Sequence, residues 1–317
     1  MSRMSRERRT HLGFLIDRGE NSFDNVAAAK FLAGKTVMVT GAGGSIGSEI
    51  VRQVAQAGAK KILMVERNEN ALYEIDRTKV SAGAIPLLAD VGDEAAMRKI
   101  FETCLPEVVL HAAAYKHVPM VEMNPDAAWR NNVEATKILA SLAKEYGVRR
   151  FVFISTDKAV NPISVMGKTK LAAEQAVMAM NDESGESTSF CAVRFGNVFG
   201  SSGSVVPLWR EQIARKQPVT VTHPEMRRYF MTIQEAVSLV LQASSRNENA
   251  IYTLDMGESV SMLELAERMI SIAGYRPYID IPIVYIGMRP GEKLFEEIDV
   301  SEKSYYRTDM AKIYITK

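Results

Sequence analysis

The stretch Thr40-Gly41-Ala42-Gly43-Gly44-Ser45-Ile46-Gly47 decides the fold of this chain. It follows the apolar, β-branched run Thr36–Thr40 and opens a segment in which Ile46, Ile50 and Val54 recur every fourth residue, the spacing of one helix face. Glycines at 41, 44 and 47 permit a tight turn and let the first amides of the helix approach a pyrophosphate closely. The sequence therefore predicts a dinucleotide site lined by Gly41, Gly43, Gly44, Ser45, Ile46 and Gly47.

The alternation of strand and helix continues beyond this stretch. We expect further buried strands at Ile62–Glu66, Pro86–Leu88, Val108–His111, Phe151–Ile154 and Phe190–Arg194. Apolar strands separated by helices are typical of a parallel sheet covered on both faces, so the predicted fold is α/β, with a doubly wound, Rossmann-type sheet. After Gly200 the alternation loosens, and a strand at Ile251–Leu254 and a helix at Met262–Ala273 follow. We predict an N-terminal arm (1–34), a dinucleotide-binding domain (35–200) and a smaller, mainly substrate-binding part (201–317) interleaved with the last strands.

Residues at the strand ends bear on the choice of cofactor. Glu66 ends the second strand, where a carboxylate accepts hydrogen bonds from the adenosine ribose and disfavours a 2′-phosphate, so NAD is expected. Arg67 could instead hold that phosphate, which leaves NADP open. Asp90 and Val91 are predicted to reach the adenine, although Asp90 could equally cap a helix together with Asp93. Small residues after the fourth strand leave room for the middle of the cofactor: Ala112, Ala113 and Ala114.

Composition limits the classes of function. The 317 residues carry a net charge of +1, which gives no reason to expect a nucleic-acid partner. No apolar run reaches the ~18 residues of a membrane span and no signal-peptide core is visible, so we expect a cytoplasmic homo-oligomer without an integral membrane span. No His, Cys and carboxylate cluster has metal-ligand spacing, so no metal is expected. The basic start Met1–Arg9 is interpreted as a solvated arm, with a helix on a partner subunit or a lipid contact as alternatives.

A polar cluster, Ser155-Thr156-Asp157-Lys158, directly follows the predicted strand Phe151–Ile154. In a doubly wound sheet the carboxyl ends of the strands face the bound cofactor, here the nicotinamide. Met166 and Lys170 come a few residues later at a predicted helix start, and their four-residue spacing places them on one helix face. A carboxylate beside an amine at this place suits general acid–base chemistry.

Four segments make the chain resemble the capsular-polysaccharide type of UDP-N-acetylglucosamine 4,6-dehydratase, an extended member of the short-chain dehydrogenase/reductase superfamily. These segments are Ser155-Thr156-Asp157-Lys158-Ala159-Val160-Asn161-Pro162, Met166-Gly167-x-x-Lys170, Ala114-Tyr115-Lys116-His117-Val118-Pro119 and Arg194-Phe195-Gly196-Asn197-Val198. The resemblance runs from about Lys35 to Ile298. Most such proteins have tyrosine where this chain has Met166, and members with methionine there resemble the C5-retaining enzymes of bacterial glycan pathways. Larger members carry membrane helices ahead of this domain, and the lack of such a segment here again favours the cytosol.

The resemblance implies that C4 of the sugar is oxidised, water is eliminated across C5 and C6, and the hydride returns to C6. It also implies that Asp157 protonates the departing C6 hydroxyl and that Lys158 removes the C5 proton. A lysine is a base only if its pKa falls, which burial or a neighbouring cation such as Lys170 is expected to achieve. Lys170 is expected to hold the nicotinamide ribose. Because the thioether of Met166 cannot accept a proton, we assign the C4 hydroxyl proton to Thr156, acting as a relay to water.

The same resemblance places UDP-N-acetylglucosamine against several segments. Arg228 and Arg289 are expected to clamp the diphosphate, because a guanidinium binds two oxygens at once. Glu292 is expected to accept the hydroxyls of the uridine ribose. The remaining expected substrate contacts come from the turns after the strands: Lys116, His117, Ser155, Asn197, Ser204 and Val205.

Two other functions stay open. A UDP-sugar 4-epimerase on the same fold would oxidise and reduce C4 only, and such an enzyme generally keeps the tyrosine that Met166 replaces and lacks an Asp157–Lys158 pair. A non-catalytic NAD-binding regulator would explain the missing tyrosine as decay. The presence of Asp157, Lys158 and Lys170 together argues against decay.

Overall fold

The computed structural model describes residues 26–181, 188–297 and 304–316, so the basic start of the predicted arm lies outside the described residues. Within them, nine strands form one large sheet in the order β13-β14-β10-β6-β5-β4-β1-β2-β3. The strands are β1 Thr36–Thr40, β2 Lys61–Glu66, β3 Ala84–Leu88, β4 Val108–His111, β5 Arg150–Ile154, β6 Ser189–Arg194, β10 Ile251–Leu254, β13 Tyr305–Arg307 and β14 Ile313–Thr316. The strands from β3 to β10 run parallel, which confirms the predicted doubly wound sheet.

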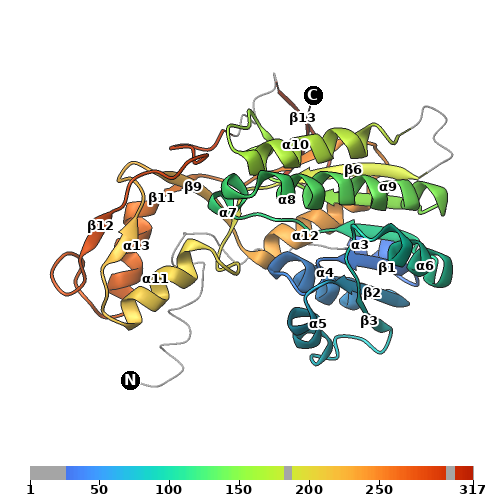
Figure 1. Ribbon diagram of the computed structural model, residues 1–317, viewed down its shortest axis with the longest axis horizontal. Helices are drawn as coiled ribbons and strands as arrows, with labels where there is room; N and C mark the ends of the chain where they lie inside the picture. Colours follow the sequence, from blue (N-terminus) through green and yellow to red (C-terminus); the bar gives the residue numbers. More distant parts are fainter. Residues whose placement is uncertain (1–25, 182–187, 298–303, 317) are drawn as a thin grey trace.

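Helices cover both faces of this sheet (Figure 1). Those packed on one face are α3 Val26–Leu32, α4 Ser45–Gln56, α5 Glu69–Asp76 and α12 Ile233–Ser244. Those on the other face are α6 Glu94–Cys104, α9 Ala135–Glu145 and α10 Val165–Met178. The helices bury their apolar faces against strands such as β4 and β5, which are buried along their whole length. A hydrophobic core therefore lies on each side of the sheet.

The turn between β1 and α4 has the geometry that the glycine motif predicts. Gly41 adopts a positive φ of 65°, and a Cβ there would lie 2.8 Å from the backbone nitrogen of Ala113. The backbone nitrogen of Gly44 donates to the carbonyl of Gly41 at 3.0 Å, which closes the turn. The first amides of α4 are thereby directed beyond the carboxyl end of β1, which is where a doubly wound fold is expected to bind a pyrophosphate.

A second, smaller group of elements lies at one end of the molecule (Figure 1). It contains a three-stranded sheet of β11 Ser259–Ser261, β9 Arg227–Met231 and β7 Asn197–Val198, and the pair β12 Ile283–Tyr285 and β8 Val219–Val221. The helices α11 Val205–Ala214 and α13 Met262–Ile272 pack with them around Trp209, Phe230 and Leu265. We call this group the cap.

Two terminal segments differ from expectation. Val26–Leu32 of the predicted arm is a helix that packs against α4 and α12 with Ala28 and Leu32 buried, so this part of the arm belongs to the folded domain. At the other end, no element was predicted after residue 305, yet β14 pairs antiparallel with β10, and β13 with β14. The C-terminal segment thus returns to the large sheet.

Candidate active site

The polar cluster after β5 is held by continued pairing with the segment after β6. The backbone nitrogen of Ser155 donates to Val193 at 2.8 Å, and that of Asp157 donates to Phe195 at 3.0 Å. The chain then turns into a short 3-10 helix, Asp157–Ala159. These backbone hydrogen bonds between the segments after β5 and β6 thus fix the side chains of the cluster at the carboxyl edge of the sheet.

A cavity of about 730 Å³ opens between this edge and the cap. It brings together most of the residues that the sequence predicts for catalysis and substrate binding: Lys116, His117, Ser155, Thr156, Lys158, Met166, Lys170, Asn197, Ser204, Val205, Arg228, Arg289 and Glu292. From the predicted cofactor set, Ile46, Ala112 and Ala114 also line it. The other predicted cofactor residues do not line it. Except for Ala113, which follows β4, they lie at or after the ends of β1, β2 and β3.

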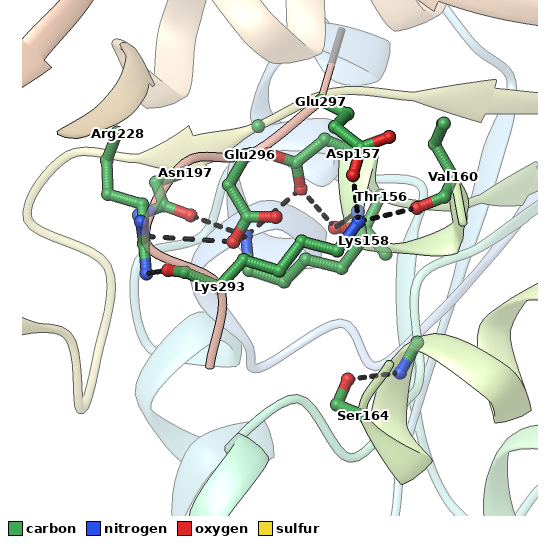
Figure 2. Close-up of polar contacts among 12 residues, drawn as sticks. Thr156, Asp157, Lys158, Val160, Ser164, Asn197, Arg228, Lys293, Glu296 and Glu297 are labelled. Atoms are coloured by element: carbon green, nitrogen blue, oxygen red, sulfur yellow. Dashed lines mark hydrogen bonds and ion pairs between the residues drawn. The ribbon is translucent and has the colours of Figure 1, made fainter. Parts of the chain in front are cut away.

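Asp157 and Lys158 lie in direct contact (Figure 2). The Lys158 Nζ donates to Asp157 Oδ1 at 3.0 Å and to Asn197 Oδ1 at 2.9 Å, and Thr156 Oγ1 donates to Asp157 Oδ1 at 2.8 Å. Asp157 itself is only 3% exposed and lies behind Thr156 and Lys158. Its Oδ2 is buried without a hydrogen-bond partner among the described residues, and Asp157 does not itself line the cavity, whereas its neighbours Thr156 and Lys158 do.

Glu296 is a functional candidate that the sequence did not reveal. Its Oε1 lies 3.3 Å from Lys158 Nζ and 3.7 Å from Arg228 Nε, and Figure 2 shows it between these two cations. Glu296 follows the segment around Glu292 by only a few residues, but nothing in the sequence separates it from its exposed neighbour Glu297. The burial of Glu296 results from how the C-terminal segment crosses the site.

The pKa of Lys158 moves opposite to the expected direction. Burial alone would lower it, but the negative charges of Asp157 and Glu296 outweigh burial and raise the pKa above its ordinary value. With Asp157, Asn197 and Glu296 all within reach of its Nζ, Lys158 is held as an ammonium. It becomes a base only if substrate binding changes this environment.

Lys170 shows the fall in pKa that was expected of Lys158. Burial lowers the pKa of its amine to about 7. Its Nζ donates to the carbonyl of Ile154 at 2.5 Å and lies 3.9 Å from the centre of the Phe153 ring. Met166, one turn earlier on α10, is 4% exposed and lines the same cavity.

The strand ends beside the glycine turn fit a dinucleotide. Glu66 Oε2 accepts from the backbone nitrogen of Gly43 at 3.2 Å, so its carboxylate lies beside the turn where a ribose would bind. Gly43 and Gly47 have no room for a Cβ, which would collide with Ala71 and with the carbonyl of Gly41. The backbone nitrogen of Ser202, from the loop before the cap, donates to Ser45 Oγ at 3.0 Å and so covers this turn.

Arg67 and Asp90 hold each other rather than pointing separately at a ligand. Arg67 donates to Asn131 Oδ1 at 2.9 Å and to Asp90 Oδ2 at 3.4 Å, and it stacks on the Tyr115 ring at 4.6 Å. Asp90 Oδ1 accepts from Gly92, while the cap of α6 is Asp93. This pair forms the edge of the crevice next to Val91, which is buried.

The two predicted arginines are placed differently. Arg228 is buried and donates to the backbone carbonyls of Arg227, Lys293 and Leu294 at 2.7–3.1 Å, so it fixes the segment that carries Glu296. Arg289 is exposed and lines the cavity, where it can reach an anionic group. Glu292 accepts from the backbone nitrogen of Arg289 at 3.1 Å, which closes the turn between them.

Asn132 is a second residue that the sequence analysis missed. It lies in a π-helical turn, Arg130–Glu134, that joins α8 Pro125–Trp129 to α9. Its side chain exchanges hydrogen bonds with the backbone of Tyr115 at 2.8 and 3.0 Å and donates to Thr169 at 3.1 Å. π-helical turns are frequent at functional sites, and two asparagines within a helical stretch were the available signal.

The fold defines a class of protein, the doubly wound Rossmann-type α/β proteins, here with a cap over the carboxyl edge of the large sheet. The chain belongs to the polysaccharide biosynthesis protein family, because the sequence model of that family matches residues 37–317. It is 46% identical over 306 residues to the capsular polysaccharide biosynthesis protein CapD of Staphylococcus aureus. This match covers 95% of the present chain and 51% of CapD. The chain thus spans about half the length of curated relatives such as CapD and EpsC of Bacillus subtilis.

Relatives of two activities match at similar identity. An inverting UDP-N-acetylglucosamine 4,6-dehydratase of Campylobacter jejuni is 30% identical (89% of this chain, 82% of that protein), and a UDP-glucose 4-epimerase of Rickettsia canadensis is 31% identical (88% and 82%). Among solved structures, Pen from Bacillus thuringiensis is 31% identical with a TM-score of 0.83, covering 90% of this chain and 87% of Pen. The dTDP-glucose 4,6-dehydratase DesIV of Streptomyces venezuelae, solved with NAD bound, shares the fold at a TM-score of 0.74 and 19% identity (83% and 88%).

These comparisons establish the polysaccharide biosynthesis family and the fold that it shares with dehydratases and epimerases of known structure. Across the described ranges, no helix combines the length and apolar character needed to cross a bilayer. The same residues contain no group of three or more His, Cys, Asp or Glu side chains arranged to hold a metal ion.

Proposed function

We propose that this chain is a UDP-N-acetylglucosamine 4,6-dehydratase that retains the configuration at C5. The observation that carries the proposal is the contact between Asp157 and Lys158 at the cavity, with Lys158 Nζ 3.0 Å from Asp157 Oδ1. Dehydration requires a proton donor for the departing hydroxyl and an acceptor for the C5 proton, and a carboxyl beside an amine supplies both.

In this proposal each residue keeps one task. Asp157 protonates the C6 hydroxyl as it leaves, and Lys158 accepts the proton from C5 once the bound sugar has displaced part of its carboxylate environment. The hydroxyls of Ser155 and Ser204 are buried without a partner among the described residues, and both residues line the cavity, so they are ready to bind sugar hydroxyls. Arg289 binds the diphosphate and Glu292 the uridine ribose, with Asn197 orienting Lys158.

We further propose NAD rather than NADP as the cofactor. When bound, the nicotinamide supplies a reversible hydride acceptor. The carboxylate of Glu66 beside the glycine turn would repel a 2′-phosphate, and the neighbouring Arg67 is already engaged by Asn131 and Asp90. Retention at C5 rests on Met166, because the resemblance associates methionine at this position with retaining enzymes.

The epimerase alternative has a specific point in its favour, the 31% identity to UDP-glucose 4-epimerases. An epimerase has no proton to remove at C5 and none to deliver at C6. The buried Asp157–Lys158–Glu296 cluster would then have no chemical task, although burying three charges is costly. A regulator that only binds NAD would have no need of the sugar-sized cavity.

Proton NMR of the purified protein with UDP-N-acetylglucosamine in D₂O, without added reductant, tests the proposal. A C6 methyl signal from a 4-keto-6-deoxy sugar would support dehydration, and its couplings would report the C5 configuration. Formation of UDP-N-acetylgalactosamine would replace the proposal by the epimerase. An unchanged spectrum with this substrate and with other UDP-sugars would favour the regulator.

A further inference from the structure

The oxidation of a sugar hydroxyl releases a proton, and position 166 offers nothing to receive it. Most relatives by resemblance have a tyrosine there, whereas the thioether of Met166 has no exchangeable proton and is a very weak acceptor. Met166 lines the cavity, so the place of the missing phenol is part of the site. The nearest basic group on the same face of α10 is Lys170, four residues later.

Among the residues that the structure describes, no acidic side chain forms an ion pair with the buried Lys170. The residue is 6% exposed, and its Nζ contacts a carbonyl, that of Ile154, and the face of the Phe153 ring. The acid closest along its helix is Glu174, but Arg194 Nε binds both oxygens of that carboxylate, at 2.8 and 3.1 Å. The charge of Glu174 is therefore neutralised by β6 and compensates Lys170 little.

Burial outweighs the charges around Lys170. Burial is the largest influence and lowers its pKa to about 7, while Glu174 opposes this fall. His111 of β4 is buried and neutral, because burial and the charge of Lys170 lower its pKa to about 3. Asp157 and Lys158, on the turn after β5, are engaged with each other and with Glu296. A neutral amine at position 170 can keep its hydrogen bond to Ile154 and still present a lone pair.

We propose that Lys170, rather than the relay through Thr156 that the sequence suggested, accepts the proton of the C4 hydroxyl when the sugar is oxidised. The hydroxyl of Thr156 already donates to Asp157. This inference rests on the proposed function. The O–H bond at C4 would break, its proton would join the lone pair of Lys170 Nζ, and the O–H electrons would form the C4 carbonyl, with a bound nicotinamide as the acceptor of the hydride. Lys158 would return its proton to C5 after the elimination. The proton that Asp157 gives to the departing hydroxyl is matched by the one held by Lys170, which exchanges through solvent before the next turnover.

The first test measures the protonation of Lys170 without any turnover. In protein carrying ¹³C-labelled lysine, the Cε signal absent from a Lys170→Met variant is assigned to Lys170 and followed from pH 5.5 to 10. We expect a midpoint for Lys170 between about 6 and 8, and the signal of exposed Lys168 on the same helix, assigned by Lys168→Met, serves as the reference. A midpoint for Lys170 above 9 would overturn the proposal, whatever the enzyme does with a sugar.

The second test separates proton transfer from cofactor binding. Lys170→Arg keeps a cation and its donors but cannot become neutral, so we expect cofactor to remain bound while kcat falls by about 10²–10⁴-fold. Adding Met166→Tyr to this variant should raise kcat at least tenfold, because the phenol, assisted by the arginine, supplies a proton acceptor again. Near-normal kcat for Lys170→Arg, or a double variant as inactive as the single one, would leave Lys170 with a binding role only.

The two proposals fail in distinguishable ways. If wild-type protein forms no 4-keto-6-deoxy sugar but Lys170 titrates near pH 7, the proposed function is wrong and the amine remains a base for some other hydroxyl. If wild-type protein dehydrates the sugar and Lys170→Arg does so equally well, the proposed function stands and the role of Lys170 is wrong.

Discussion

The ammonium of Lys158 is surrounded by oxygens from three separate segments, and its charge state depends on all of them. Glu296 contributes the most distant of these oxygens, at 3.3 Å, and raises the pKa of Lys158 together with Asp157. Replacing Glu296 by Gln removes one negative charge and leaves the burial in place, so the pKa of Lys158 falls. A rate that requires neutral Lys158 rises with pH through this pKa. We expect that limb of the kcat profile to move to lower pH by about one unit.

Glu297 is the matched control for this substitution. It is exposed and pairs with Lys293 at 3.1 Å and with Asn161 at 2.7 Å, away from Lys158. Glu297→Gln should leave the pH profile where it is. A profile that moves equally in both variants, or in neither, would show that Glu296 does not set the protonation of Lys158.

The second prediction at the residue scale concerns stability and Lys170. Its pKa is about 7 in the folded state against an ordinary 10.5, so the folded protein binds fewer protons than the unfolded chain between these values. The contribution of Lys170 to the free energy of unfolding therefore falls as pH decreases from 10.5 to about 7 and is constant below. Lys170→Met removes this contribution, so its advantage over wild type should be roughly 3 kcal/mol larger at pH 6 than at pH 9.5.

Urea unfolding at the two pH values measures this difference. Lys168→Met, on the exposed face of α10, serves as the control and should show the same small effect at both. An advantage of Lys170→Met that does not change with pH would mean that Lys170 is not a neutral amine in the folded protein.

At the scale of elements, the loop that leads into α11 offers a paired test. Gly200 and Gly203 have nearly the same backbone, with φ of 70° and 69°, so alanine strains both by about 1 kcal/mol. They differ in surroundings, because a Cβ on Gly203 would collide with the ring of His117, while one on Gly200 would meet nothing within 4 Å. We expect both variants to lose similar stability, and only Gly203→Ala to displace His117 and raise KM for the UDP-sugar. Equal KM values would place His117 outside the substrate site.

The elements also show where prediction from sequence succeeds and fails. Strands such as β1 and β4 were predictable because apolar runs and the glycine turn are local signals. The cluster after β5 was predictable for the same reason, since a buried strand followed by four polar residues marks a sheet edge. Glu296 and the β13–β14 pair were not, because their positions depend on contacts with residues more than fifty positions away. The predicted fall in the pKa of Lys158 was wrong for the same reason, because the carboxylates of Asp157 and Glu296 reverse the effect of burial.

At the scale of the whole molecule, the cavity separates two cores. The large sheet packs around residues such as Leu110 and Val193, and the cap packs separately around Trp209 and Leu265. A UDP-sugar in this cavity must contact both parts, because Lys158 and Lys170 come from the sheet and Arg289 from the cap side. Its binding should therefore stabilise both against local opening.

Hydrogen exchange followed by mass spectrometry resolves this prediction along the chain. With saturating UDP-N-acetylglucosamine, we expect slower exchange in residues 155–159, 197–205 and 287–296, which border the cavity from both sides. The opposite, amino end of the sheet provides the internal control. Amides around the separate cavity there, which Lys30, Lys35 and Arg149 line, should exchange at an unchanged rate. NAD alone should protect residues 41–47 and little of the cap. If UDP-N-acetylglucosamine protects neither side while NAD still protects the glycine turn, the chain binds a dinucleotide without a sugar substrate, as expected of a regulator.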